Sequence, residues 1–145
     1  MGGGDRENND FGNFQQGSVS GTKFKDKDDD GVKDAGETGL SGWKIHVFNS
    51  AGTEVTGSPV TTDGSGNYSI SLNPGTYTVC EEIIDHTGWV QSYPTAATAE
   101  STSCTALGAS LAARGWTVTV VSQGTTSLRD FGNTALRDEA WGRLR

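Results

Sequence analysis

With 145 residues, the chain has the length of one domain with short flanking segments. Hydrophobic residues make up 32% and there are 21 glycines, which favours many short strands joined by turns and argues against a thick helical core. The net charge of −7 argues against nucleic-acid binding, and no apolar run is long enough to span a membrane.

The N-terminal segment, residues 1–16, is polar and glycine-rich and is predicted to be a flexible lead-in. It contains the tetrapeptide Asp-Phe-Gly-Asn at residues 10–13, and the same tetrapeptide returns at residues 130–133. The second copy closes the last strand-like segment, whereas the first copy precedes the first such segment, as in a tandem array. We therefore predict one repeat over residues 17–133 that carries the end of a preceding repeat, with a tail or linker at residues 134–145.

Alternation of apolar and polar residues between turns predicts about seven short strands. Pro59 weakens the third of them, and the alanine-rich segment 106–114 is predicted to be a loop with helical turns. The pattern favours an all-β fold, a seven-stranded antiparallel β-sandwich with an immunoglobulin-like or transthyretin-like layout. The predicted strands are 19–24, 43–47, 53–62, 68–72, 77–81, 116–120 and 128–133.

An acidic run after the first strand fits the twelve-residue calcium-loop template, with carboxylates at positions one, three, five, nine and twelve and Gly31 at position six. Calcium takes about six to eight oxygen ligands, so the chain must wrap around the ion. Lys27 and Asp29 are predicted to point outward, and the alternative reading is a solvated acidic surface. No helices flank the loop, so the site would be structural and not a calcium sensor. The predicted ligands are Asp26, Asp28, Asp30, the carbonyl of Val32, Asp34 and Glu37.

Two cysteines, Cys80 and Cys104, lie in separate segments of this β-rich sequence. In an extracellular domain such a pair is predicted to form a disulfide, although two free thiols are the alternative. The bond would stabilise the fold by about 3 kcal/mol in the chain-entropy model. No further cysteine accompanies the pair, so a zinc site is not predicted.

The sequence contains no recognisable catalytic motif, so an enzyme is not predicted. His46 and His86 are far apart in the sequence and are expected at the surface. Trp89 and Tyr93 lie between the two cysteines and are a candidate ligand contact, for example with carbohydrate, if their rings are exposed.

The stretch from Ser20 through the acidic loop to Trp43 resembles the calcium-binding B-type repeats of serine-aspartate-repeat surface adhesins, and more distantly the collagen-adhesin B-type domains. The resemblance implies a seven-stranded sandwich with bound calcium, serving as a stalk or spacer beside neighbouring repeats of a secreted or cell-surface protein. Two alternatives stay open: a module that binds carbohydrate or a host matrix protein, and a subunit of an extracellular filament. Further matching segments are 62–68, 74–79, 88–89 and 130–133.

Some collagen-adhesin relatives form a spontaneous Lys–Asn isopeptide bond with the help of a buried acid, and the resemblance raises the same question here. Glu81 stands where that acid would be, Asn133 lies in the terminal strand, and Lys23 or Lys25 lies in the first. If Phe24 takes the inward position of the first strand, however, both lysines point outward. The sequence therefore argues against the bond and favours Glu81 as a strand-end acid that makes a hydrogen bond.

Overall fold

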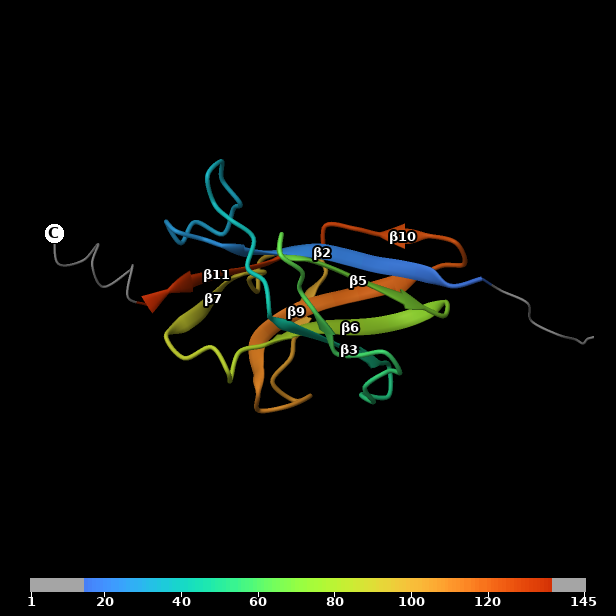
Figure 1. Ribbon diagram of the computed structural model, residues 1–145. Coiled ribbons are helices and arrows are strands. Elements are labelled where there is room, and N and C mark those ends of the chain that lie inside the picture. Colours follow the sequence, from blue (N-terminus) through green and yellow to red (C-terminus); the bar gives the residue numbers. More distant parts are fainter. Residues whose placement is uncertain (1–14, 137–145) are drawn as a thin grey trace, which may run out of the picture.

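The computed structural model describes residues 15–136, which form two five-stranded sheets packed face to face (Figure 1). This arrangement confirms the predicted all-β sandwich. The strands are β2 (Gly17–Lys25), β3 (Lys44–Asn49), β4 (Val60–Thr61), β5 (Asn67–Leu72), β6 (Gly75–Glu82), β7 (Trp89–Tyr93), β8 (Ser101–Ser103), β9 (Leu111–Val120), β10 (Thr125–Thr126) and β11 (Phe131–Ala135).

The first sheet has the order β10-β2-β11-β7, and its fifth strand, β5, also pairs with β2. The second sheet has the order β4-β3-β6-β9-β8. β2 pairs in antiparallel fashion with β5 but in parallel with both β10 and β11. The sheet is therefore mixed, whereas the sequence predicted antiparallel pairing alone. After β9 the chain crosses to the first sheet and runs beside β2, so the first and last strands are neighbours (Figure 1).

The core lies between the sheets and is built by the period-two alternation of the strands. β5 shows this most clearly, because Tyr68, Ile70 and Leu72 are buried while the residues between them are exposed. Phe131 of β11 belongs to this core and is fully buried. Other core residues are Val19, Ile45, Val47, Val79, Trp116, Val118 and Val120.

Several elements differ from the sequence-based prediction. β7, β8 and β10 were not predicted, and residues from Leu111 onward extend β9 where helical turns were expected. The predicted strand over 53–62 shrinks to β4, since Gly57 has a positive φ of 93° and Pro59 follows it. β7 pairs with β11 although its residues are half-buried or exposed without clean alternation, which explains why periodicity did not reveal it.

The predicted disulfide is confirmed, because the sulfurs of Cys80 and Cys104 are 2.06 Å apart. It ties the segment before β9 to β6 in a fully buried setting. The tetrapeptide at residues 10–13 and most of the predicted tail lie outside the described residues. Over residues 15–136, no helix is long and apolar enough to cross a membrane.

Candidate functional site

Lys23 is fully buried, which corrects the expectation that both lysines of the first strand point outward. Counting along β2 from the core residue Val19, the alternation passes through Gly21 and places Lys23 on the inner face. Phe24 is buried as well, but by the same alternation on the opposite face, where its ring packs against Tyr93. The prediction failed because an inward Phe24 was assumed, whereas the alternation from Val19 would have found the buried lysine.

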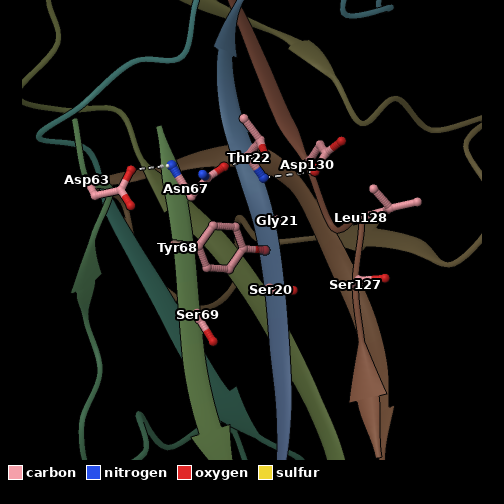
Figure 2. Close-up of a pocket in the computed structure, with 10 residues that line it drawn as sticks. All are labelled: Ser20, Gly21, Thr22, Asp63, Asn67, Tyr68, Ser69, Ser127, Leu128 and Asp130. Atoms are coloured by element: carbon pink, nitrogen blue, oxygen red, sulfur yellow. Dashed lines mark hydrogen bonds between the residues drawn. The ribbon is translucent and has the colours of Figure 1, made fainter. Parts of the chain in front are cut away.

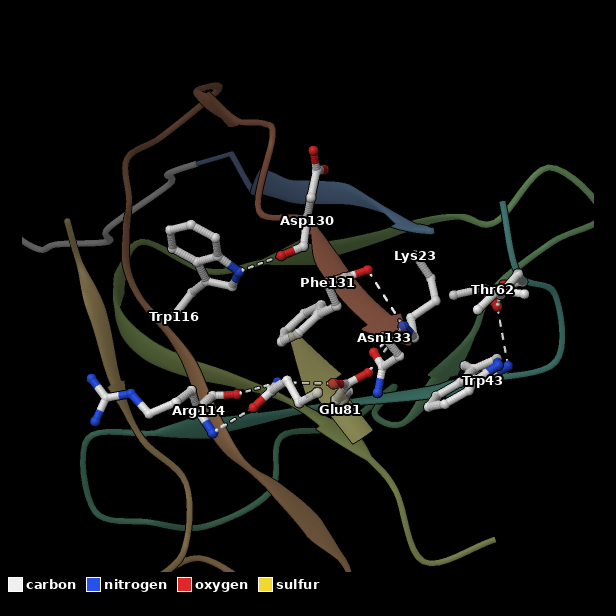
Figure 3. Close-up of polar contacts among 11 residues, drawn as sticks. Lys23, Trp43, Thr62, Glu81, Arg114, Trp116, Asp130, Phe131 and Asn133 are labelled. Atoms are coloured by element: carbon white, nitrogen blue, oxygen red, sulfur yellow. Dashed lines mark hydrogen bonds and ion pairs between the residues drawn. The ribbon is translucent and has the colours of Figure 1, made fainter. Parts of the chain in front are cut away.

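Three buried polar side chains meet in the core: Lys23 of β2, Glu81 of β6 and Asn133 of β11 (Figure 3). The Nζ atom of Lys23 donates to Oδ1 of Asn133 and contacts the carbonyl of Phe131 at 3.4 Å. It also lies 3.4 Å from Oε1 of Glu81, within ion-pair distance. All three side chains have no measurable exposure, so the cluster is shielded from water.

Burial changes the protonation of this cluster. It lowers the pKa of Lys23 from 10.5 to about 8, an effect that the nearby charge of Glu81 opposes only in part. It also raises the pKa of Glu81, again against the attraction of Lys23. Both shifts favour an uncharged pair, because a low-dielectric surrounding disfavours both charged forms. A neutral amine is a nucleophile, so the environment prepares Lys23 for attack on a carbonyl carbon.

Two atoms of the cluster make no hydrogen bond of ordinary geometry within residues 15–136: Nδ2 of Asn133, and Oε1 of Glu81, which has only the ion pair with Lys23. Unpaired buried polar atoms are rare in folded proteins and call for an explanation. The Trp43 ring lies over Nζ of Lys23 at 4.3 Å and helps to keep water away. An amine, an amide and an acid are thus held in contact in a dry pocket, an arrangement suited to acyl transfer from the amide to the amine.

The acidic loop brings the predicted carboxylates together. Oxygens of Asp26, Asp28 and Asp30 lie within 4.8 Å of one another, and so do oxygens of Asp28, Asp34 and Glu37. The two groups share Asp28 and include every carboxylate that the template named. The carbonyl of Val32 stays a predicted ligand, and its side chain points to solvent with 57% exposure.

The two ends of this loop are anchored while its middle is exposed. Asp26 is fully buried and Glu37 is 7% exposed. Oδ2 of Asp26 accepts the backbone N–H of Gly31 at 2.8 Å, and Glu37 accepts the backbone N–H groups of Lys27 and Asp34 at 2.8 and 2.7 Å. The chain is therefore already wrapped around its carboxylates, with a positive φ of 76° at Gly31 as the template requires.

Crowding of the carboxylates shows in their protonation. The pKa of Asp28 is raised to about 6 by partial loss of hydration, then by Asp26 and by the charge of Asp30. Hydrogen bonding with Asp30, together with partial loss of hydration, raises the pKa of Asp34. A divalent cation would relieve this repulsion, and carboxylate oxygens are the ligands that calcium prefers. The donor set therefore fits the ion.

The acidic loop lies beside β7 and β11 of the first sheet. A Cβ atom on Gly31 would lie 3.6 Å from the carbonyl oxygen of Ser92 and 4.0 Å from the ring of Tyr93. The backbone N–H of Asp26 donates to the carbonyl of Asn133 at 2.8 Å. The first residue of the calcium-loop template is thus bonded directly to the last strand.

The candidate ligand contact at Trp89 and Tyr93 is not a flat exposed platform. Both residues are half-buried. Trp89 packs edge-on against Trp43 at 5.7 Å, whereas Tyr93 packs against Phe24 at 6.4 Å and Trp116 at 5.7 Å. Packing against other aromatic residues accounts for both rings, and a sugar contact stays a prediction that this geometry does not favour.

The two histidines are half-buried, although the sequence placed them at the surface. His86 stacks on Trp43 with ring centroids 3.6 Å apart. His46 lies between two carboxylates, with Nδ1 at 2.6 Å from Glu54 and Nε2 at 2.8 Å from Glu82. Both histidines therefore have structural contacts, and neither contacts a side-chain nucleophile in these interactions.

An open pocket of about 360 Å³ lies between β2, β5 and the segment 127–130 (Figure 2). Two hydrogen bonds cross this pocket. The backbone N–H of Thr22 donates to Oδ1 of Asp130 at 2.8 Å, and the hydroxyl of Tyr68 donates to the carbonyl of Arg129 at 2.5 Å. These bonds fasten β2 and β5 to the segment that leads into β11. The pocket thus marks a further connection between the first strand and the end of the repeat.

The family model described as the SdrD B-like domain matches residues 17–133. No curated protein sequence matches the chain. Among solved structures, it is similar to the Bacillus anthracis TIE protein, with a TM-score of 0.52 and 18% identity over 83% of this chain and 18% of that chain. It is also similar to GBS52, the minor pilin of Streptococcus agalactiae, with a TM-score of 0.45 and 15% identity over 84% of this chain and 45% of that chain. The chain therefore spans less than half of either structure, and the likeness to the TIE protein shows the fold alone.

Proposed function

Given that the chain belongs to the SdrD B-like domain family, we propose that it is a structural repeat, a stalk or spacer in an extracellular or cell-surface protein of the adhesin kind. We propose further that the repeat is closed by an isopeptide bond between Lys23 and Asn133 and stabilised by calcium in the acidic loop. The observation that carries the proposal is the buried contact of Lys23 with Glu81 and Asn133.

The position of the bond suits a repeat that transmits mechanical tension along the chain. Lys23 lies on the first strand described and Asn133 on the last, and these strands are parallel neighbours. In a tandem array, tension enters near Gly17 and leaves after Ala135. A covalent bond between β2 and β11 would carry this tension directly, so that the residues between Lys23 and Asn133, 110 positions apart, would bear little of it.

The proposed reaction is a transfer of the Asn133 acyl group to the Lys23 amine. Oε1 of Glu81 takes a proton from Nζ, and the neutral Nζ attacks Cγ of Asn133. Glu81 then gives its proton to Nδ2 and takes a second proton from Nζ as the bond between Cγ and Nδ2 breaks. One ammonia leaves, an amide bond remains, and Glu81 retains one proton, so atoms and charge balance. The reaction occurs once in each chain, and the repeat is therefore not an enzyme.

Intact-mass measurement tests the bond. The chain is expected to be lighter by one ammonia than the mass calculated from its sequence with the disulfide formed. Proteolysis should release a branched peptide that contains Lys23 and Asn133, and Lys23→Met should restore the full mass. Lys25→Met is the matched control, because Lys25 lies on the same strand but is half-buried, and this variant should still lose ammonia. A parent chain of full mass would refute the bond.

Calcium is proposed to bind between the carboxylates of Asp26, Asp28, Asp30, Asp34 and Glu37, with the carbonyl of Val32. When bound, the ion would screen the repulsion among these groups and hold the loop against the first sheet. At about 100 times its dissociation constant, a ligand that binds only the folded state stabilises by about 2.7 kcal/mol.

Thermal melting with and without a chelator tests calcium binding. The melting temperature of the parent is expected to fall when calcium is removed, and the effect should be reduced in Asp28→Asn because Asp28 belongs to both carboxylate groups. Asp29→Asn, outside both groups, should respond like the parent. Equal melting temperatures in calcium and chelator would contradict the metal site and leave the isopeptide proposal unaffected.

A further inference from the structure

Gln91 of β7 connects the two sheets through its side-chain amide. Its Oε1 accepts the backbone N–H of Arg114 at 2.9 Å, and its Nε2 donates to the carbonyl of Arg114 at 2.8 Å. Nε2 also donates to Oε2 of Glu81 at 2.8 Å. Both N–H groups and the oxygen of the Gln91 amide are thus engaged.

A break in the ladder between β6 and β9 makes this contact possible. Cys80 pairs with Gly115 and Glu82 with Leu111, so β6 does not pair with Arg114. The backbone N–H and carbonyl of Arg114 are then available to Gln91. Since the backbone N–H can only donate and the carbonyl can only accept, they determine which end of the Gln91 amide is the oxygen.

This orientation has a consequence for Glu81. Oε2 of Glu81 accepts a hydrogen bond from Gln91, and a carbonyl oxygen accepts better than a hydroxyl oxygen. When Glu81 is protonated, its proton is therefore favoured on Oε1, the oxygen 3.4 Å from Nζ of Lys23. Apart from this ion pair, Oε1 accepts no hydrogen bond of ordinary geometry within residues 15–136, and the amide nitrogen of Asn133 donates none.

We propose that Gln91 is a positioning residue for the isopeptide reaction, which holds Glu81 so that Oε1 rather than Oε2 moves the protons between Lys23 and Asn133. This inference rests on the proposed bond. Gln91 itself touches neither reacting group in the contacts described, so its effect on the reaction would pass through Glu81. Without Gln91, the carboxyl group of Glu81 could rotate and place its proton away from the leaving nitrogen.

The test follows the reaction during refolding. The chain is recovered in denaturant from inclusion bodies, before it has folded, so that its starting mass includes the ammonia, and it is then diluted into buffer with its disulfide oxidised. Intact mass records the loss of ammonia over time and tryptophan fluorescence records folding. Gln91→Met is expected to slow the loss of ammonia by roughly 10- to 100-fold relative to folding, because the acid is misplaced.

The pH dependence separates positioning from a purely structural role. A hydrogen bond donated to a carboxylate favours its charged form, so loss of Gln91 raises the pKa of Glu81. The acid side of the pH–rate profile should therefore move to higher pH in Gln91→Met. The variant Gln91→Glu keeps the shape, and in its ionised form it replaces the donor with a carboxylate oxygen beside Glu81. It should also be slow, and it serves as the second variant where Gln91→Met does not fold.

Ser101→Ala is the matched control, since Ser101 accepts a hydrogen bond from Arg114 at 2.8 Å and belongs to β8, away from Glu81. This variant should react at the parental rate. Parental kinetics in the folded Gln91 variants, or a slower reaction that only follows slower folding with an unchanged pH profile, would overturn the role of Gln91. A parent chain that folds without losing ammonia would refute the isopeptide bond itself, and the role of Gln91 with it.

Discussion

Replacing Asn133 with alanine should remove the isopeptide bond and lower stability by an amount that depends on the loop which the bond closes. Lys23 and Asn133 are 110 positions apart. In the chain-entropy model, a cross-link over such a loop stabilises the fold by about 4.8 kcal/mol. The disulfide spans 24 positions and is worth about 3.5 kcal/mol by the same relation. The isopeptide bond should therefore contribute more to stability than the disulfide.

The corresponding change in melting temperature is large. For a domain of about 120 residues, the unfolding entropy is about 0.25 kcal/mol per degree, so Asn133→Ala should melt about 20 °C below the parent. Calorimetry of the two proteins in the same calcium concentration, with the disulfide oxidised, measures this difference. Intact mass on the same samples shows which of them carries the bond.

Two further variants make the comparison specific. Glu81→Gln keeps the size of the side chain but cannot relay protons, so it should also be unlinked and should melt far below the parent. Asn73→Ala is a control at an exposed asparagine and should melt within a few degrees of the parent. The reasoning would be refuted if the parent carries the bond and yet Asn133→Ala melts at nearly the same temperature.

The remaining predictions concern pH, calcium, the disulfide and the packing of β11. In urea titrations, the unlinked Asn133→Ala variant should gain stability as the pH rises from about 8 to 10.5, because over this range Lys23 is protonated only in the unfolded chain. In the linked parent the Lys23 nitrogen is an amide and does not titrate. The parent should therefore lack this rise. Calorimetric titration should detect calcium binding to the parent, with weaker binding in Asp28→Asn and parental binding in Asp29→Asn. Reduction of the disulfide should lower the free energy of unfolding in denaturant titrations by about 3.5 kcal/mol while leaving the isopeptide bond intact. Gly132→Ala should lose about 1–3 kcal/mol in the same assay, since its Cβ would lie 2.5 Å from the ring of buried Phe24.

The acidic loop could be recognised from the sequence because all its groups lie within twelve consecutive residues. The template spacing named Asp26, Asp28 and Asp30 at one end and Asp34 and Glu37 at the other, and the structure brings their oxygens together. Here the hydrogen bonds that Asp26 and Glu37 accept from Gly31, Lys27 and Asp34 all run within these twelve residues, so the local backbone sets most of the spacing. The bound ion itself stays a prediction.

The sandwich was likewise predictable in outline, since alternation reports which residues of a strand face a core. The segments around Ile45, Tyr68 and Val118 were found in this way. β7 was missed because its place depends on pairing with β11, and its own pattern carries little alternation. Such a strand is defined by its neighbour, which a single sequence does not show.

From the sequence, an isopeptide bond involving Lys23, Glu81 and Asn133 was only a hypothesis. The assumed inward position of Phe24 argued against it. The three residues come from three strands in two sheets, and their contact depends on the parallel register of β2 with β11 and on how the sheets are stacked. Gln91 acquires its role through a break in the ladder between β6 and β9. A short stretch of sequence can specify a loop that folds around its own ligands, whereas groups 50 or more residues apart meet only when the strands that carry them are packed.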